Sequence, residues 1–279
     1  MTLLSAADTA ILTRVIKFLA DPSPFFVTSP PAPRVGIDVL TVAGNWYDGP
    51  HKAIALARAA EHRPTATILL TGGRNERLTP PEAVALGGEP MLLQSILSGP
   101  IHNISRSRMV IYTGSRITNH NLQAMLMFAT TSHRFERRSL SMQLFEEAFL
   151  VRREAAALSV LLKRDEAATR AISSLRVRPV GARSFEQLVT THGGHEDVAL
   201  ALVLGEVERL RQYSNATLQG GSGELTLPAE AAFMPGLESE VDRLLVQHRE
   251  LLRSGRALLA DRQRLFSSGA APRSVPLVE

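Results

Sequence analysis

Short apolar runs rich in β-forming residues alternate with stretches of helical spacing along most of the chain. The run from Val39 to Ala43 is mostly apolar and too short for a helix, which is typical of a strand buried on both faces. Strands that alternate with helices form parallel sheets with right-handed crossovers. The pattern therefore predicts an α/β fold, with an open, mainly parallel five-stranded sheet and helices on both faces. The predicted strands cover residues 38–45, 66–73, 108–112, 139–145 and 175–180.

Apolar residues three and four positions apart predict helices between and beyond these strands. The predicted helices cover residues 5–20, 51–61, 80–98, 146–174, 197–212 and 238–266, and a further helix follows the polar turn 113–121 and ends near residue 131. Five prolines between residues 21 and 34 exclude a central strand or a helix interior there. We expect an α/β ligand-binding domain over residues 1–212, in which 1–34 form an N-terminal helix and a proline-rich loop. A C-terminal loop and helical part, 213–266, and a flexible tail, 267–279, follow it.

Composition narrows the classes of function. The 279 residues include no cysteine, which excludes disulfides, thiolate nucleophiles and cysteine-ligated zinc. The formal net charge of +4 selects no class of ligand, and an aromatic content of 5% is low for a platform that stacks single-stranded nucleic acid. No nucleic-acid partner is expected. Because no signal peptide and no run of about 18 apolar residues is visible, we expect a cytoplasmic protein without a membrane span.

Glycines close the first two predicted strands. Gly44 and Asn45 follow the first strand, and Gly72 and Gly73 follow the second. Ligands of open α/β sheets bind beyond the carboxyl ends of the strands, where glycine lets a ligand approach the main chain. These four residues are therefore candidate ligand contacts, although Gly44 and Asn45 equally suit a plain strand-to-helix turn. Neither a dinucleotide-binding fingerprint nor a P-loop motif is present.

A polar turn after the third predicted strand holds the densest set of hydrogen-bonding side chains. Ser115, Asn119 and Asn121 lie in it as candidate ligand contacts. Ser115, Thr118 and Asn119 equally suit the N-cap of the next helix. Glu89 opens the second half of a helix that is broken at a glycine pair, where a carboxylate is favoured by the helix dipole. An ionised carboxylate also accepts hydrogen bonds from a hydroxyl or a cationic group, so Glu89 is a candidate ligand contact.

Two further sets of polar and charged residues are explained without a metal or a ligand. The histidine-containing motif 192–196 has the composition of a metal site, but a glycine-rich loop lacks a rigid face for ligands, and no metal is predicted. Glu146, Glu147, Arg152 and Arg153 lie at the start of the helix predicted after the fourth strand. Because residues three and four apart meet on a helix, we expect ion pairs among them.

Several segments together resemble one known family. They are DVLTVAGN (38–45), ILLTGG (68–73), GGEPMLLQSIL (87–97), the segment from Ser115 to Asn121, the pair Arg152-Arg153 and GEVERLRQYSN (205–215). In this order they are similar to the YdcF branch of the SanA/YdcF-like family, a widespread bacterial family of largely uncharacterised function. The resemblance spans residues 5–247 approximately.

The resemblance implies a Rossmann-like α/β domain with a smaller C-terminal helical part. It also implies a pocket at the strand carboxyl ends for a nucleotide-like ligand, which in this branch is S-adenosylmethionine. The family usually has an acidic residue at the end of the third strand and a glutamate just before the helix asparagine. This chain has Tyr112 or Thr113 at the first position and His120 at the second. If the family's chemistry uses those carboxylates, this chain has altered or lost it.

Our first hypothesis is a small-molecule-binding protein with S-adenosylmethionine as its leading ligand. The predicted ligand contacts are Gly44, Asn45, Gly72, Gly73, Ser115, Asn119, Asn121, Arg152 and Arg153. The two arginines would close on a carboxylate or phosphate, since guanidinium groups bind such groups in a bidentate manner. Glu89 would hold a ribose hydroxyl or a cationic group.

Two alternatives stay open. The first is an enzyme that acts on a phosphorylated or cell-envelope precursor substrate with Glu89 or His120 as the general base, a role that the near-neutral pKa of histidine suits. Against it, no nucleophile–base pair is visible from spacing. The second is a non-catalytic interaction protein that uses the arginine-rich helix predicted over 238–266 as its contact surface.

Overall fold

The computed structural model describes residues 4–25, 38–43, 49–73, 85–115, 118–136, 138–215 and 225–253. The strands are β1 (Val39–Ala43), β2 (Thr67–Thr71), β3 (Met109–Tyr112), β4 (Leu140–Glu147) and β5 (Ile172–Val180). The helices are α1 (Ala6–Leu19), α2 (Gly49–Glu61), α4 (Glu89–Ser98), α5 (Thr118–Glu136), α6 (Val151–Arg164), α7 (Glu166–Ala171), α8 (Phe185–Thr191), α9 (Glu196–Ser214) and α10 (Glu238–Gln247). Short 3₁₀ helices include η1 (Ser23–Phe25), η2 (Arg106–Arg108) and η4 (Ala229–Ala231).

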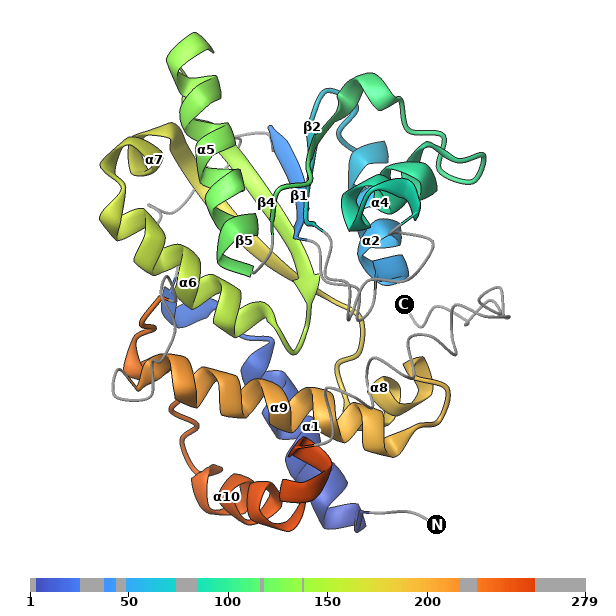
Figure 1. Ribbon diagram of the computed structural model, residues 1–279, viewed down its shortest axis with the longest axis vertical. Coiled ribbons are helices and arrows are strands. Elements are labelled where there is room, and N and C mark those ends of the chain that lie inside the picture. The colour runs from blue at the N-terminus through green and yellow to red at the C-terminus, as the bar shows by residue number, and fades with distance from the viewer. Residues whose placement is uncertain are drawn as a thin grey trace.

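The five strands form one sheet in the order β3-β2-β1-β4-β5, and every neighbouring pair is parallel. This order is that of a Rossmann-like sheet, in which the chain first builds outward from β1 and then returns to add β4 on its other side. Helices cover both faces, with α5, α6 and α7 on one side and α2 and α4 on the other (Figure 1). The predicted fold class is therefore confirmed.

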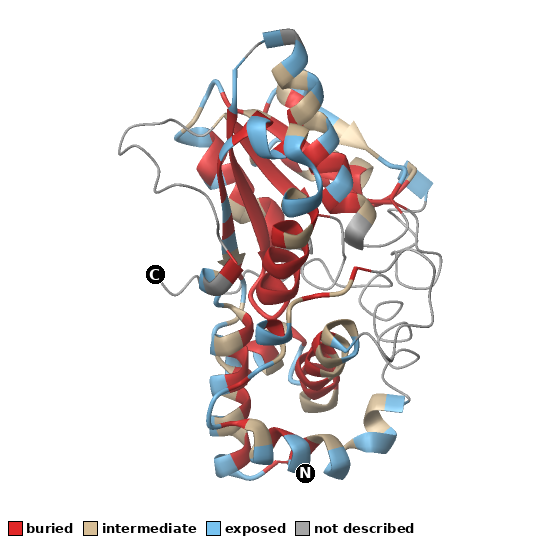
Figure 2. Ribbon diagram, turned by 90° about the vertical axis from the view of Figure 1, so that its left-hand side faces the viewer, coloured by how far each residue is buried: buried red, intermediate tan, exposed pale blue. Residues whose placement is uncertain are grey.

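Two apolar cores lie on opposite faces of the sheet because side chains alternate along each strand. On β1, Leu40 and Val42 face the core beneath α2 and α4, whereas Val39 and Ala43 face the core beneath α5 and α6. All five positions of β1 are buried, which explains why the strand reads as a nearly continuous apolar run. Figure 2 shows that the sheet is buried, whereas the exposed residues lie on the outer helices.

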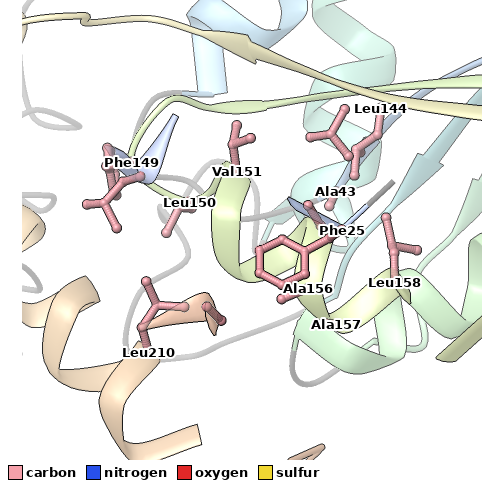
Figure 3. Packing of buried hydrophobic residues seen from close by; sticks show 14 of the residues in the cluster. Phe25, Ala43, Leu144, Phe149, Leu150, Val151, Ala156, Ala157, Leu158 and Leu210 are labelled. Atoms are coloured by element: carbon pink, nitrogen blue, oxygen red, sulfur yellow. The ribbon is translucent and has the colours of Figure 1, made fainter. Parts of the chain in front are cut away.

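The larger core continues past the sheet into a group formed by α1, α8, α9 and α10, which lies together at one end of the molecule (Figure 1). Figure 3 shows the residues that bridge the two regions. Leu150 and Val151 at the start of α6 lie between Leu144 of the sheet and Leu210 of α9. The N-terminal helix thus packs with the C-terminal helices, and an ion pair between Asp8 and Arg243 joins α1 to α10.

The region after the fourth strand differs from its prediction. Residues 146–174 were expected to be one helix, but β4 extends through Glu147, and two helices, α6 and α7, follow it. Glutamate favours helices in isolation, yet Glu146 lies opposite Pro179 and Glu147 lies opposite Val180 in the parallel ladder with β5. Pairing across the sheet therefore outweighs local preference. Asp165 separates the two helices, because its side chain accepts a hydrogen bond from the N–H of Ala168 and caps α7.

The C-terminal helix predicted over 238–266 begins at the expected residue, and α10 ends at Gln247. The part of that prediction beyond residue 253 lies outside the described residues. Within the described ranges, no helix combines the length and the apolar character needed to cross a lipid bilayer.

Candidate functional site

The carboxyl ends of β1 and β4 form the point where the direction of sheet building reverses. After β1 the chain enters α2 on one face, and after β4 it enters α6 on the other. Helices that leave two adjacent strands toward opposite faces separate the loops above them, and ligands of open α/β proteins bind at this position. The register places Val42 opposite Phe145, so the next residues, Ala43 and Glu146, lie side by side at this edge.

Lys52, in the first turns of α2, is buried at this edge. Its Nζ donates to the main-chain oxygen of Ala43 at 2.9 Å and to Oε1 of Glu146 at 2.8 Å. The exposed fraction of the two paired side chains is 1% for Lys52 and 0% for Glu146. Burial alone would lower the pKa of Lys52, but the nearby carboxylates, first Glu146 and then Glu147 and Glu154, raise it above its usual value. Lys52 is therefore a permanent cation that joins α2 to the ends of two strands.

Glu146 also faces Glu154, which lies on α6 and is fully buried. Burial is the main cause that raises the pKa of Glu154 well above its usual range, and the neighbouring charge of Glu146 raises it further. No described group donates a hydrogen bond to either oxygen of Glu154 or to Oε2 of Glu146. Glu154 therefore favours its protonated form.

Glu89 approaches the same charges from the N-terminus of α4. It is 6% exposed, and its main-chain N–H points to the carbonyl oxygen of Gly73 at 3.5 Å. Burial raises the pKa of Glu89 to about 7, Lys52 opposes this shift, and Glu146 adds to it. No side-chain cap is formed at this helix end, where Gly88 is the N-cap. Glu89 thus faces Lys52 and Glu146 instead of capping its own helix.

Together, four carboxyl groups face one ammonium group at this edge of the sheet. We call the set of Lys52, Glu89, Glu146, Glu147 and Glu154 the carboxylate cluster. Its acidic members come from α4, the end of β4 and α6, and its ammonium group comes from α2. A cluster of this kind can accept hydrogen bonds, hold protons and attract a positive charge, and it disfavours an anion.

The glycine pair after β2 has a packing role. The N–H of Gly72 donates to the carbonyl oxygen of Tyr112 at 3.0 Å, and the N–H of Ser115 donates to the carbonyl oxygen of Gly72 at 3.1 Å. A Cβ atom on Gly73 would lie 1.6 Å from the carbonyl oxygen of Ser115, so only glycine fits. The ends of β2 and β3 therefore touch through bare main chain. The N–H of Gly72 is already engaged, and ligand contacts by Gly72 and Gly73 stay a prediction.

The predicted polar residues after β3 differ in how far their side chains are buried. Ser115 is buried, and no described group is hydrogen bonded to its Oγ. Asn121 is also buried and His120 is half-buried, both in the first turn of α5. Asn119 belongs to the same helical turn, but its side chain lies outside the described part, as do Gly44 and Asn45. The predicted roles of these residues stay predictions.

The two predicted arginines contact the C-terminal helical part. Arg152 donates to the main-chain oxygens of Asp21, Glu230 and Ala231 at 2.8–3.2 Å, and its guanidinium carbon lies 3.8 Å from the centre of the Phe18 ring. A guanidinium with three carbonyl partners joins α6 to both ends of the chain. It would have to break these bonds to close on a ligand, so a ligand role for Arg152 stays a prediction.

Arg153 is oriented toward α9. Its Nε donates to Glu206, which is fully buried and also contacts Arg209. This ion pair attaches the start of α6 to α9, and Arg153 lies close enough to Glu154 to favour the ionised form of that carboxyl. A ligand role for Arg153 likewise stays a prediction.

Sequence reasoning missed four members of the carboxylate cluster. Glu146, Glu147 and Glu154 were expected on one predicted helix, and the ion pairs expected there were local. Their position directly after a strand was the available signal, since strand ends gather at one edge of a parallel sheet. Lys52 carried no signal of its own, because its partner lies 94 residues away.

The histidine-containing motif 192–196 meets α2. His192 is buried, and its pKa is lowered to about 4, first by burial and then by the neighbouring His51 and His195. His192 is therefore uncharged at neutral pH. Within the described ranges, no group of three or more histidine or acidic side chains is arranged to hold a metal ion.

Comparisons with protein-family models, with curated proteins and with solved structures give no match to this chain.

We predict that Gly73→Ala destabilises the protein by about 3 kcal/mol or more, because the new Cβ atom would overlap a main-chain oxygen that cannot move alone. Urea unfolding followed by circular dichroism measures the change. The matched control is Gly205→Ala on α9, where a Cβ atom would meet nothing within 4 Å and the variant should gain up to about 1 kcal/mol. Equal stability of Gly73→Ala and the wild type would contradict the close approach.

We predict that the raised pKa of Glu89 makes the stability of the protein depend on pH. The carboxyl of Glu89 has an ordinary pKa of 4.5 when unfolded and about 7 when folded, so between these values the folded state holds a proton that the unfolded chain releases. Its contribution is present below pH 4.5 and is lost as the pH rises through 7. Glu89→Gln removes this loss, and at pH 8 it should be more stable than the wild type by on the order of 3 kcal/mol.

Urea unfolding at half-unit steps from pH 4.5 to 8.5 measures this difference. Glu186→Gln is the control, because Glu186 also lies in the first turn of a helix but is exposed. Its curve should run parallel to that of the wild type. A Glu89→Gln curve that also runs parallel to the wild type would show that Glu89 titrates normally.

Proposed function

We propose that the carboxyl edge of the sheet binds a small nucleoside-type molecule, with S-adenosylmethionine as the leading candidate. The observation that carries this proposal is Glu89, a buried carboxyl at a helix N-terminus that faces Lys52 and Glu146 beside the reversal point of the sheet. Ligands of this fold class bind at such a point. Glu154 is fully buried at this edge, and no described group donates to its oxygens. Because such a carboxyl group is costly to maintain, its presence supports a binding role over a packing role.

The chemistry of the cluster favours particular ligand groups. An ionised carboxylate only accepts hydrogen bonds, so Glu89 suits ribose hydroxyls, an ammonium group or a sulfonium. Phosphate groups would be repelled by the surplus of carboxyl groups around Lys52. S-adenosylmethionine offers hydroxyls and positive charge without a phosphate, which supports it over adenine nucleotides.

Isothermal titration calorimetry with S-adenosylmethionine, adenosine and ATP tests this proposal. We expect S-adenosylmethionine to bind and ATP to bind more weakly or not at all. Glu89→Gln should weaken binding of S-adenosylmethionine by roughly 10- to 100-fold, the usual effect of removing a charged hydrogen-bond partner, while Glu186→Gln should not change it. The absence of both heat and a thermal shift with all three compounds would count against the proposal.

A second candidate is general-base catalysis by Glu89 on a phosphorylated or cell-envelope precursor substrate, whose phosphate would have to lie away from the carboxyl groups around Lys52. One observation favours it, namely that burial raises the pKa of Glu89 to about 7, and a general base works best when its pKa is near the working pH. His120 is the other predicted base, and it lies on a different element, α5.

Assays with p-nitrophenyl phosphate and a short isoprenyl diphosphate test this candidate. If Glu89 is the base, the rate should rise with pH through about 7 and fall by roughly 10²- to 10⁴-fold in Glu89→Gln. His120→Gln should then keep most of the rate. Loss of activity in His120→Gln alone would assign the base to His120, and no turnover of either compound would remove the candidate.

A further inference from the structure

The sheet face on the side of α2 carries exposed arginines where β5 forms the border of the sheet. Side chains at alternate positions of a strand lie on the same face, so Arg176 and Arg178 share the face of Val180, which packs in the core beneath α2 and α4. Val180 is buried, whereas both arginines are exposed. Because β5 is the last strand in the sheet order, the two arginines lie on a part of the face that α2 does not cover.

Arg183 lies just after the same strand and adds a third guanidinium group. Its Nη2 donates to the main-chain oxygen of Pro179 at 2.8 Å. Burial and then the positive charge of Arg178 lower the pKa of Arg183, so these two guanidinium groups repel each other. The guanidinium carbon of Arg178 also lies 5.8 Å from the centre of the Phe145 ring. Among the described residues, no carboxylate forms an ion pair with Arg176, Arg178 or Arg183.

A buried glutamine beside these arginines is a second, independent observation. Gln143 of β4 lies opposite Arg176 in the parallel ladder and shares the face of Phe145. It is 6% exposed, yet its side-chain amide makes no hydrogen bond to a described residue. Buried polar side chains are nearly always paired, and an exception requires an explanation such as water, an ion or a ligand. Charged residues and proline protect the edges of sheets, which accounts for them on β5 but not for a glutamine on the inner strand β4.

We propose that this group of side chains binds the phosphate group of a phosphorylated small molecule. We call the group the arginine face, and its members are Gln143, Arg176, Arg178 and Arg183. A phosphate monoester has three terminal acceptor oxygens and close to two negative charges at neutral pH, which suit several guanidinium donors and one amide donor. A carboxylate has fewer oxygens and less charge, so it would leave donors unused. The arginine face is separate from the carboxylate cluster, and the proposal does not depend on the proposed function.

The small extent of the arginine face favours a small molecule over nucleic acid. Arg176 and Arg178 are two positions apart on one strand, which is about 6.6 Å. A surface for nucleic acid extends along many phosphates and often adds aromatic side chains. Toward the carboxyl edge the face ends at an acidic residue, because Glu147 follows Phe145 on the same face and lies opposite Val180.

Two compounds that differ in their anionic group test the proposal. Glycerol 3-phosphate carries a phosphate monoester, and glycerate carries a carboxylate on a similar body. Calorimetry at constant ionic strength measures both affinities. We expect glycerol 3-phosphate to bind roughly 10-fold more tightly at pH 7.5, since it accepts more charged hydrogen bonds. Its affinity should rise several-fold between pH 5 and 7.5, because a phosphate monoester gains its second charge near pH 6, whereas the affinity for glycerate should stay constant.

Two variants separate binding from packing. Arg178→Gln should weaken binding of glycerol 3-phosphate by roughly 10-fold or more. Gln143→Leu should weaken it by roughly 3- to 10-fold but leave the urea midpoint unchanged or raised, because a buried amide without a partner stabilises nothing. The control is Arg164→Gln, since Arg164 is an exposed arginine at the end of α6, on the other side of the sheet. Its affinity should equal that of the wild type.

Each contrary outcome has a definite meaning. Equal affinity of the wild type and Arg178→Gln, or of glycerol 3-phosphate and glycerate, would overturn the proposal. Lower stability of Gln143→Leu with unchanged binding would make Gln143 a packing residue and overturn the site as described. If neither compound binds but single-stranded DNA or a glutamate-rich peptide does, the face docks a macromolecule and the proposal is wrong. Heat from ATP that Arg178→Gln removes belongs to this face and not to the carboxyl edge, so the test leaves the proposed function separate.

Discussion

The buried ammonium of Lys52 is the interaction on which the carboxyl edge of this sheet depends. It binds the last residue of β1 and a carboxylate at the end of β4, and it is carried by α2, which packs on the opposite face from α6. Leaving one partner of such a buried pair without the other typically costs about 3–5 kcal/mol, since the remaining charge stays away from water. The geometry of the edge and its charge are therefore set by the same contact.

The chemical character of the edge follows from the same arrangement. Many Rossmann-like sites present free main-chain N–H groups to an anion. Among the described residues of this edge, Gly72 donates its N–H to Tyr112, and the glycine pair brings two strand ends into contact. The described acidic side chains near Lys52 are the basis of our proposal that the edge prefers hydroxyl donors and cations to phosphate groups.

The arginines illustrate how one sequence feature acquires a different role in three dimensions. Arg152 and Arg153 are adjacent on α6, yet one donates to three main-chain oxygens and the other pairs with Glu206 on α9. Both attach the start of α6 to the helices at the end of the molecule. The residue that follows them, Glu154, faces the strand edge, so a single turn of helix connects the carboxylate cluster to the C-terminal helical part.

The sequence by itself determined the parallel α/β sheet, because buried strands and amphipathic helices differ in the local spacing of apolar residues. It also located Glu89 at the start of a helix and the glycine pair at the end of β2. Only the tertiary structure decided that Glu146 and Glu147 end a strand, since the ladder with β5 outweighs their helix preference. It alone brought Lys52 to Glu146 across 94 residues, because a buried charge is defined by partners that no local pattern records.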